Sequence, residues 1–176
     1  VLLDTFDSRR PWLIKEPRLC LLARELLPLL TRPVFVLVVR DPHAVAASLA
    51  ARDDFDSAAA LALWERYNHD AFEVSRGWPR VLVDYAELVA DPLGVCSRLF
   101  TELRAFGVDG VVEPDAAVVR EWIETSPRAN VAGSSELSST QRVLWNAIRD
   151  RSILFDDAPV APLPDAVDVP RHISGN

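Results

Sequence analysis

The chain is poor in the residues that build metal sites and covalent frameworks. Its 176 residues include no methionine, two cysteines, three histidines and six glycines. Cys20 and Cys96 lie far apart in helix-like apolar patterns, which predicts buried thiols rather than a disulfide framework. No spacing typical of a zinc site is present, so we expect no metal cofactor. No Gly-x-Ser-x-Gly elbow supports a Ser-His-Asp triad. Because the chain begins at Val1 and lacks methionine, we expect a processed product or a piece of a longer protein.

Positive charge and long apolar runs are also scarce. The 19 Lys and Arg residues are outnumbered by 26 Asp and Glu residues, which gives a net charge of −7 and argues against a nucleic-acid partner. No apolar run approaches the roughly 20 residues of a membrane span, and no signal peptide is recognisable. We therefore predict a cytoplasmic protein without a membrane partner.

The composition that remains is that of a globular domain. Hydrophobic residues make up 49% of the chain, and the length suits one domain with a sizeable core. We expect that domain to cover residues 1–156. The Pro-rich segment 157–176 has little to bury, so it is predicted to be a flexible tail.

One stretch, residues 33–50, organises the chain. An unbroken apolar run, residues 34–39, predicts a strand of a parallel sheet that is buried on both faces. Arg40 follows the run, Asp41 suits a helix N-cap, and Pro42 suits the first helical position. A cation beside free helical N–H groups would bind an anion, and Ser48 adds a hydroxyl two turns into the helix.

Further strands and helices are predicted to alternate on either side of this stretch. A short strand is expected over residues 12–15 and an amphipathic helix over residues 18–30. A further strand is expected over residues 80–84, and after Tyr85 and an acidic loop a helix over residues 93–106. Alternating strands and helices predict an α/β fold with a parallel sheet.

Three cations are expected at one edge of that sheet. Lys15 and Arg40 each end a predicted strand, and Arg18 begins the intervening helix. Ligands bind at the carboxyl ends of parallel strands, which favours a shared anion site. The alternative is a set of surface ion pairs, Arg40 with Asp41 and Lys15 with Glu16, that contribute little.

Three motifs in this order resemble the sulfotransferases that use 3′-phosphoadenosine 5′-phosphosulfate. They are W-L-I-K-E-P-R-L, V-L-V-V-R-D-P-H-A-V-A-A-S-L and V-L-V-D-Y-A-E-L-V-A-D-P, within residues 12–106. The resemblance implies a three-layer parallel sheet of the P-loop NTPase-like type. It also implies transfer of a sulfuryl group to a hydroxyl or amine of a small-molecule or glycan acceptor.

The resemblance also implies roles for particular residues. Arg40 and Ser48 match the motif that binds the 3′-phosphate, and Tyr85 matches the tyrosine that contacts adenine. Lys15 matches the lysine near the transferred group. Arg18 is predicted as a further cofactor-binding cation. Pro17 stands where many members have a catalytic histidine, so Glu16 becomes a candidate base; a solvated first-turn carboxylate is the equal alternative.

One part of the family's site has no counterpart in the chain. The loop that cradles the 5′-phosphosulfate is rich in small residues, whereas no glycine precedes Gly77 here. The expected fold therefore lacks the family's first strand and this loop, and the activity of the chain by itself stays open.

Two other functions remain open. A small-molecule or nucleotide kinase of the same architecture is one, although no Gly-Lys-[Ser/Thr] sequence is present. A non-catalytic nucleotide-binding or partner module is the other.

Overall fold

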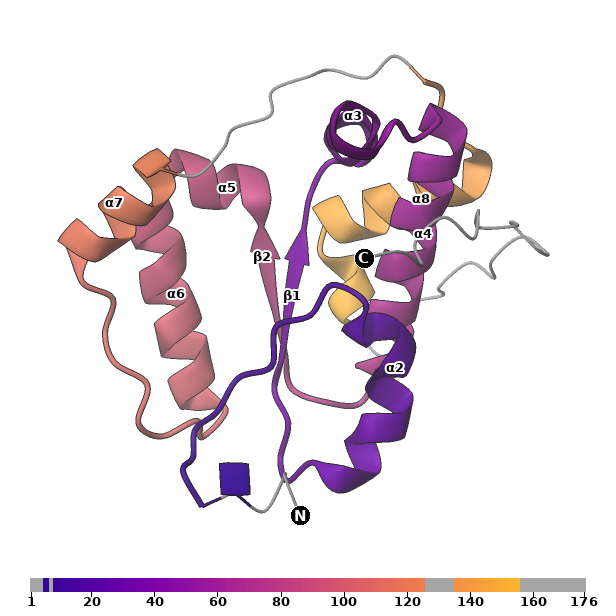
Figure 1. Ribbon diagram of the computed structural model, residues 1–176. Coiled ribbons are helices and arrows are strands. Elements are labelled where there is room, and N and C mark those ends of the chain that lie inside the picture. The colour runs from indigo at the N-terminus through magenta and orange to yellow at the C-terminus, as the bar shows by residue number, and fades with distance from the viewer. Residues whose placement is uncertain (1–4, 7, 126–134, 156–176) are drawn as a thin grey trace. The chain divides into compact units, whose positions relative to one another are not determined.

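The structure is a computed structural model that describes residues 5–6, 8–125 and 135–155 (Figure 1). The chain forms two compact units. The first unit comprises Val1–Val39 and Val74–Pro127, and the second comprises Arg40–Glu73 and Arg128–Asn176. The predicted tail, residues 157–176, lies outside the described residues, so the proposed division at residue 156 stays a prediction.

The first unit is built on a parallel pair of strands. Strands β1 (Phe35–Val39) and β2 (Arg80–Asp84) pair in register from Phe35 opposite Arg80 to Val39 opposite Asp84. Both strands occupy the segments expected from their apolar runs, so the predicted α/β class and parallel pairing are confirmed. Among the described residues the sheet has only these two strands.

Helices α5 (Tyr85–Ala90) and α6 (Pro92–Ala105) cover one face of this sheet (Figure 1). Side chains from both strands and both helices form the core there: Val34, Val36, Val81, Val83, Leu88, Val95 and Leu99. On the same face, Val38 remains 61% exposed. Helix α7 (Ala116–Thr125) packs against α6.

Two predictions about the start of the first unit need correction. Residues 12–16 are irregular rather than a strand, because no described strand pairs with them, and Leu13 is 82% exposed. Lys15 therefore does not end a strand. The predicted helix over residues 18–30 is divided into α2 (Leu19–Leu26) and a 3₁₀ turn, η1 (Leu27–Leu29), because Pro28 cannot continue an α-helix.

The segment after β2 also differs from its prediction. Tyr85 does not lead into a loop but begins α5, because Asp84 caps that helix by accepting hydrogen bonds from the N–H groups of Ala86 and Glu87. The predicted helix over residues 93–106 is confirmed as α6, and Asp91 caps it: the Asp91 carboxylate accepts from Gly94 N–H at 3.0 Å.

The second unit is helical. It contains α3 (Pro42–Asp53), nearly all of α4 (Ser57–Val74), α8 (Ser139–Arg149) and a 3₁₀ turn, η2 (Ser152–Leu154). Ala46, Ala60 and Leu61 form a core between α3 and α4. Ser138 and Gln141 form a reciprocal capping box at the start of α8. Among the described helices, none has both the length and the apolar character to cross a bilayer.

Candidate functional site

The turn between β1 and α3 carries the strongest of the predicted anion-binding residues. Asp41 caps α3, as expected: its carboxylate accepts from the N–H groups of His43, at 2.9 Å, and Ala44, at 3.0 Å. Pro42 has no N–H to offer. The expectation that free helical N–H groups bind an anion is therefore wrong here, because the protein's own carboxylate already occupies them. The binding of an anion at this turn therefore depends on side chains.

Arg40 is held by its backbone. Its carbonyl accepts a hydrogen bond from Nε1 of Trp64, in α4, at 3.0 Å. Trp64 is only 3% exposed, and its ring meets that of Trp145, in α8, edge to face at a centroid distance of 6.1 Å. Asn68 donates to the Trp64 carbonyl at 2.8 Å. The position from which the Arg40 side chain extends is therefore fixed by the core of the second unit.

Ser48 lies on the same face of α3 as its cap residue, Asp41. Ser48 is seven positions after Asp41, which is close to two helical turns, so the two lie about 10 Å apart along the axis. Ser48 is half-buried, and no described residue forms a hydrogen bond with its hydroxyl. The hydroxyl is therefore available to a ligand, and the long Arg40 side chain is suited to approach the same ligand.

His43 follows Pro42 and is half-buried. Its Nδ1 is fully buried and has no hydrogen-bond partner among the described residues. The sequence position, in the first turn of a helix, predicts a histidine that faces solvent. The structure buries one of its ring nitrogens instead.

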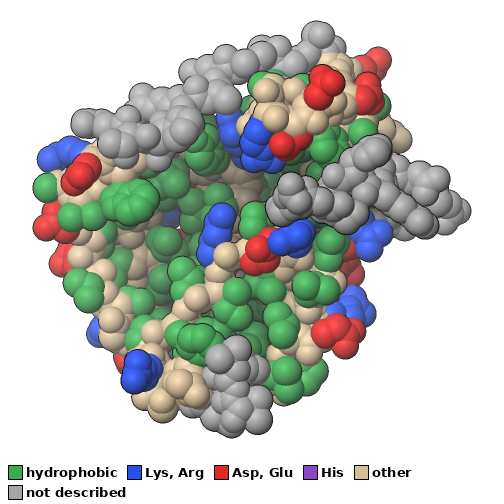
Figure 2. Space-filling view, viewed as in Figure 1, with side chains coloured by type: hydrophobic (Ala, Val, Ile, Leu, Met, Phe, Trp, Pro, Cys, Tyr) green, Lys and Arg blue, Asp and Glu red, His purple; other side chains and the backbone are tan. Residues whose placement is uncertain are grey.

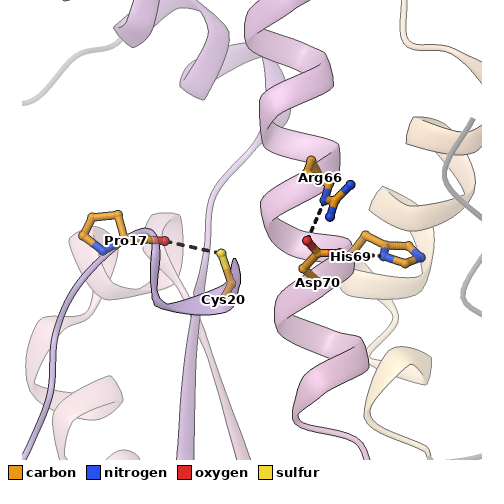
Figure 3. A network of polar contacts seen from close by, with 5 residues as sticks. All are labelled: Pro17, Cys20, Arg66, His69 and Asp70. Atoms are coloured by element: carbon orange, nitrogen blue, oxygen red, sulfur yellow. Dashed lines mark hydrogen bonds and ion pairs between the residues drawn. The ribbon is translucent and has the colours of Figure 1, made fainter. Parts of the chain in front are cut away.

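The other predicted cations precede α2 on an exposed segment. Glu16 Oε1 accepts from Arg18 Nε at 3.0 Å and from Arg18 N–H at 3.1 Å. The ion-pair partner of Glu16 is thus Arg18, while Lys15 lies exposed beside it. Within the first turn of α2, Cys20 Sγ donates to the Pro17 carbonyl at 3.4 Å (Figure 3).

This ion pair affects the chemistry of Glu16. The hydrogen bonds from the Arg18 side chain and backbone N–H lower the pKa of the Glu16 carboxyl below its ordinary value of 4.5. A general base works best with a pKa near the operating pH, so a carboxylate with a lowered pKa is a weak base. The assignment of Glu16 as a base remains a prediction.

Tyr85 is half-buried at the first position of α5. Because Val39 and Asp84 are paired across the sheet, Arg40 and Tyr85 each follow a paired residue at the carboxyl end of its strand. Lys15, Glu16, Arg18 and Tyr85 belong to the first unit, and Arg40 and Ser48 to the second.

Two sets of contacts made by side chains of α4 were not predicted from the sequence. Trp64 is 3% exposed, and a buried indole N–H needs an acceptor, which is the signal for its bond to the Arg40 carbonyl. Asp70, also in α4, forms an ion pair with Arg66 and lies 3.3 Å from Nδ1 of His69 (Figure 3). Glu65, between these features, is 5% exposed.

The second unit also contains an open hollow of about 420 Å³. None of the candidate residues lines it. Its lining combines apolar and polar side chains: Ala58, Leu61, Glu136, Leu137, Ser138 and Gln141.

The electrostatic setting of the candidates is mixed. On the face shown in Figure 2, Lys and Arg side chains are scattered among acidic and apolar ones. Within the described part of the chain, no cluster of three or more His, Cys, Asp or Glu residues is arranged to hold a metal ion. Comparison with protein-family models, with curated proteins and with solved structures found no match to this chain.

Proposed function

We propose that Arg40 and Ser48 bind the 3′-phosphate of an adenine nucleotide, and that the chain is a sulfotransferase domain using 3′-phosphoadenosine 5′-phosphosulfate. The observation that carries the proposal is the β1–α3 turn: an arginine anchored by its carbonyl, followed on α3 by a serine hydroxyl without a described partner. A guanidinium gives a charge-assisted bond to phosphate, and a hydroxyl adds a neutral one.

The remaining roles follow the resemblance. Tyr85 is proposed to contact adenine, and Lys15 to balance charge on the leaving phosphate oxygen during in-line transfer. Arg18 is proposed as a further cation for the cofactor and Glu16 as the base. The acceptor is a hydroxyl or amine of a small molecule or glycan. A three-layer fold of the P-loop NTPase-like type is part of the same proposal.

The test compares two ligands that differ only at the 3′ position. Titration calorimetry would measure 3′,5′-diphosphoadenosine and adenosine 5′-phosphate against the wild type, Arg40→Ala and Ser48→Ala. Loss of a charge-assisted bond of about 1.5–3 kcal/mol predicts a roughly 10- to 150-fold weaker affinity of Arg40→Ala for the 3′-phosphorylated ligand. Ser48→Ala should lose roughly 2- to 10-fold. Neither variant should change the affinity for adenosine 5′-phosphate.

Arg52→Ala is the matched control. Arg52 also lies on α3, but it is exposed and paired with Asp53 at 2.8 Å, so its removal should leave both affinities unchanged. Equal binding of the two ligands by the wild type, or unchanged binding by Arg40→Ala and Ser48→Ala, would refute the 3′-phosphate site.

A second candidate, a nucleotide-binding module without catalysis, is favoured by one observation. Glu16, the candidate base, is exposed and its pKa is lowered by Arg18. Transfer of ³⁵S-sulfate from the labelled cofactor to a panel of hydroxyl and amine acceptors separates the two functions. Binding without transfer supports the module, whereas transfer that is lost in Lys15→Ala supports the enzyme.

A further inference from the structure

We propose that Trp64 is a positioning residue for the nucleotide 3′-phosphate: its indole N–H holds the Arg40 carbonyl and so places the Arg40 guanidinium. This inference rests on the proposed function. It adds a residue that lies 24 positions away from Arg40 in the sequence and that matches none of the motifs in the resemblance.

The hydrogen bond joins two elements of the second unit at a point where the backbone leaves β1. Nε1 of Trp64 lies 3.0 Å from the Arg40 carbonyl oxygen, and the peptide that follows this carbonyl carries the cap residue Asp41. An indole N–H is a donor only, so this bond uses its whole hydrogen-bonding capacity. Fixing this peptide plane limits the directions in which the Arg40 side chain can leave the turn.

The indole itself has little freedom to release the carbonyl. Trp64 is 3% exposed, and the edge-to-face contact with Trp145 restrains its ring. The backbone of the same residue is tied to Asn68, whose amide donates to the Trp64 carbonyl. An arginine whose backbone is held in this way loses less freedom when it binds a phosphate, which is the advantage of preorganisation.

The experiment removes the N–H and keeps a buried aromatic ring. Trp64→Phe should weaken binding of 3′,5′-diphosphoadenosine by roughly 2- to 10-fold, because the Arg40 side chain then has to be ordered on binding, and leave adenosine 5′-phosphate unchanged. A merely structural role would weaken both ligands alike. Trp78→Phe is the control, because it also removes one indole N–H but leaves Trp64, its contact with Trp145 and its bond to Arg40 in place.

A double-mutant cycle adds the decisive comparison. If Trp64 acts through Arg40, Trp64→Phe should change neither affinity once Arg40→Ala is present, because the two effects are then not additive. An equal loss in the wild-type and Arg40→Ala backgrounds would overturn the inference. A wild type that does not distinguish the two ligands refutes the proposed function instead, so the two failures are separable.

The wild-type protein gives a second measurement if Trp64→Phe does not fold. By linkage, a ligand that needs the anchored Arg40 must in turn stabilise the hydrogen bond. Exchange of the Trp64 indole proton, assigned in ¹⁵N spectra by Phe replacement of the other tryptophans one at a time, should slow on addition of 3′,5′-diphosphoadenosine and not of adenosine 5′-phosphate. Equal exchange rates with the two ligands would contradict the positioning role.

Discussion

Asp41 shows how one side chain can change the chemistry of a turn. The β1–α3 turn presents a cation beside a helix N-terminus, which by itself favours an anion, but the Asp41 carboxylate satisfies the N–H groups of His43 and Ala44. The helix end is therefore stabilised within the chain. Recognition of an external anion falls to the Arg40 and Ser48 side chains.

The cap has a measurable effect on stability. Asp41→Ala should lower the free energy of unfolding by about 0.5–2 kcal/mol, because two N–H groups lose their acceptor. Urea denaturation monitored by far-ultraviolet circular dichroism measures this loss. Asp53→Ala, at the other end of α3, should cost clearly less, and equal losses would show that the cap is not the source.

The lowered pKa of Glu16 predicts that the stability of the fold rises with pH in the acid range. Because its pKa is lowered in the folded state, chiefly by the Arg18 side chain, the carboxylate stabilises the fold above its unfolded pKa near 4.5. This contribution is lost as the pH falls through the lowered folded pKa. Thermal unfolding of wild type and Glu16→Gln should therefore differ at pH 7 and converge in acid below 4.5. A constant difference across this range would contradict the linkage.

Glu65 is 5% exposed, and no described residue forms a hydrogen bond or ion pair with its carboxylate. A charged group that loses much of its hydration is costly, and an apolar residue of similar volume removes that cost. Glu65→Met should therefore raise the free energy of unfolding by about 1 kcal/mol, measured by urea denaturation. Glu73→Met is a comparison on the same helix, and a loss of stability in Glu65→Met would show that the carboxylate has a partner in solution.

At the scale of elements, the two strands differ in how well their shared face is covered. Val38 and Val83 are opposite each other in the parallel register, yet Val38 is 61% exposed and Val83 only 4%. Helices α5 and α6 bury the face at Val83, with Val95 against it. The same substitution at Val38 and Val83 therefore measures how burial under α5 and α6 changes the cost in stability.

Valine to threonine is a suitable change, because it keeps the shape and adds a hydroxyl. Val83→Thr should cost about 1–3 kcal/mol, since the hydroxyl has to be buried, whereas Val38→Thr should stay within about 0.5 kcal/mol. Denaturant midpoints and slopes of both variants provide the measurement. Equal costs would mean that Val38 is covered in solution.

At the scale of the whole molecule, charge limits the class of partner. The net charge is −7, and the basic side chains on the face shown in Figure 2 are scattered rather than aligned, which is unfavourable for binding a phosphate backbone at that face. We expect no retention of a 20-base-pair duplex by the protein at 0.05 M salt in a gel-shift assay. Retention that falls steeply with rising salt would contradict this expectation and show a basic binding surface.

The local chemistry of the chain was largely readable from its sequence. The apolar runs determined β1 and β2, and Asp-Pro pairs determined the starts of α3 and α6, because strand burial, N-caps and the φ angle of proline act on neighbouring residues. The predicted strand over residues 12–15 was wrong because an apolar run becomes a strand only when another strand pairs with it. Tyr85 begins a helix for a local reason, because Asp84 directly before it caps that helix.

What only the tertiary structure decided concerns contacts between distant residues. The sequence by itself places Arg40 at the end of a strand and Ser48 two turns into a helix. It does not indicate that Trp64 donates to the Arg40 carbonyl or that Trp145 restrains the indole, because both depend on how α4 and α8 pack in the second unit. Burial creates this difference: a tryptophan N–H is satisfied by water until folding removes the water, and packing then selects its acceptor.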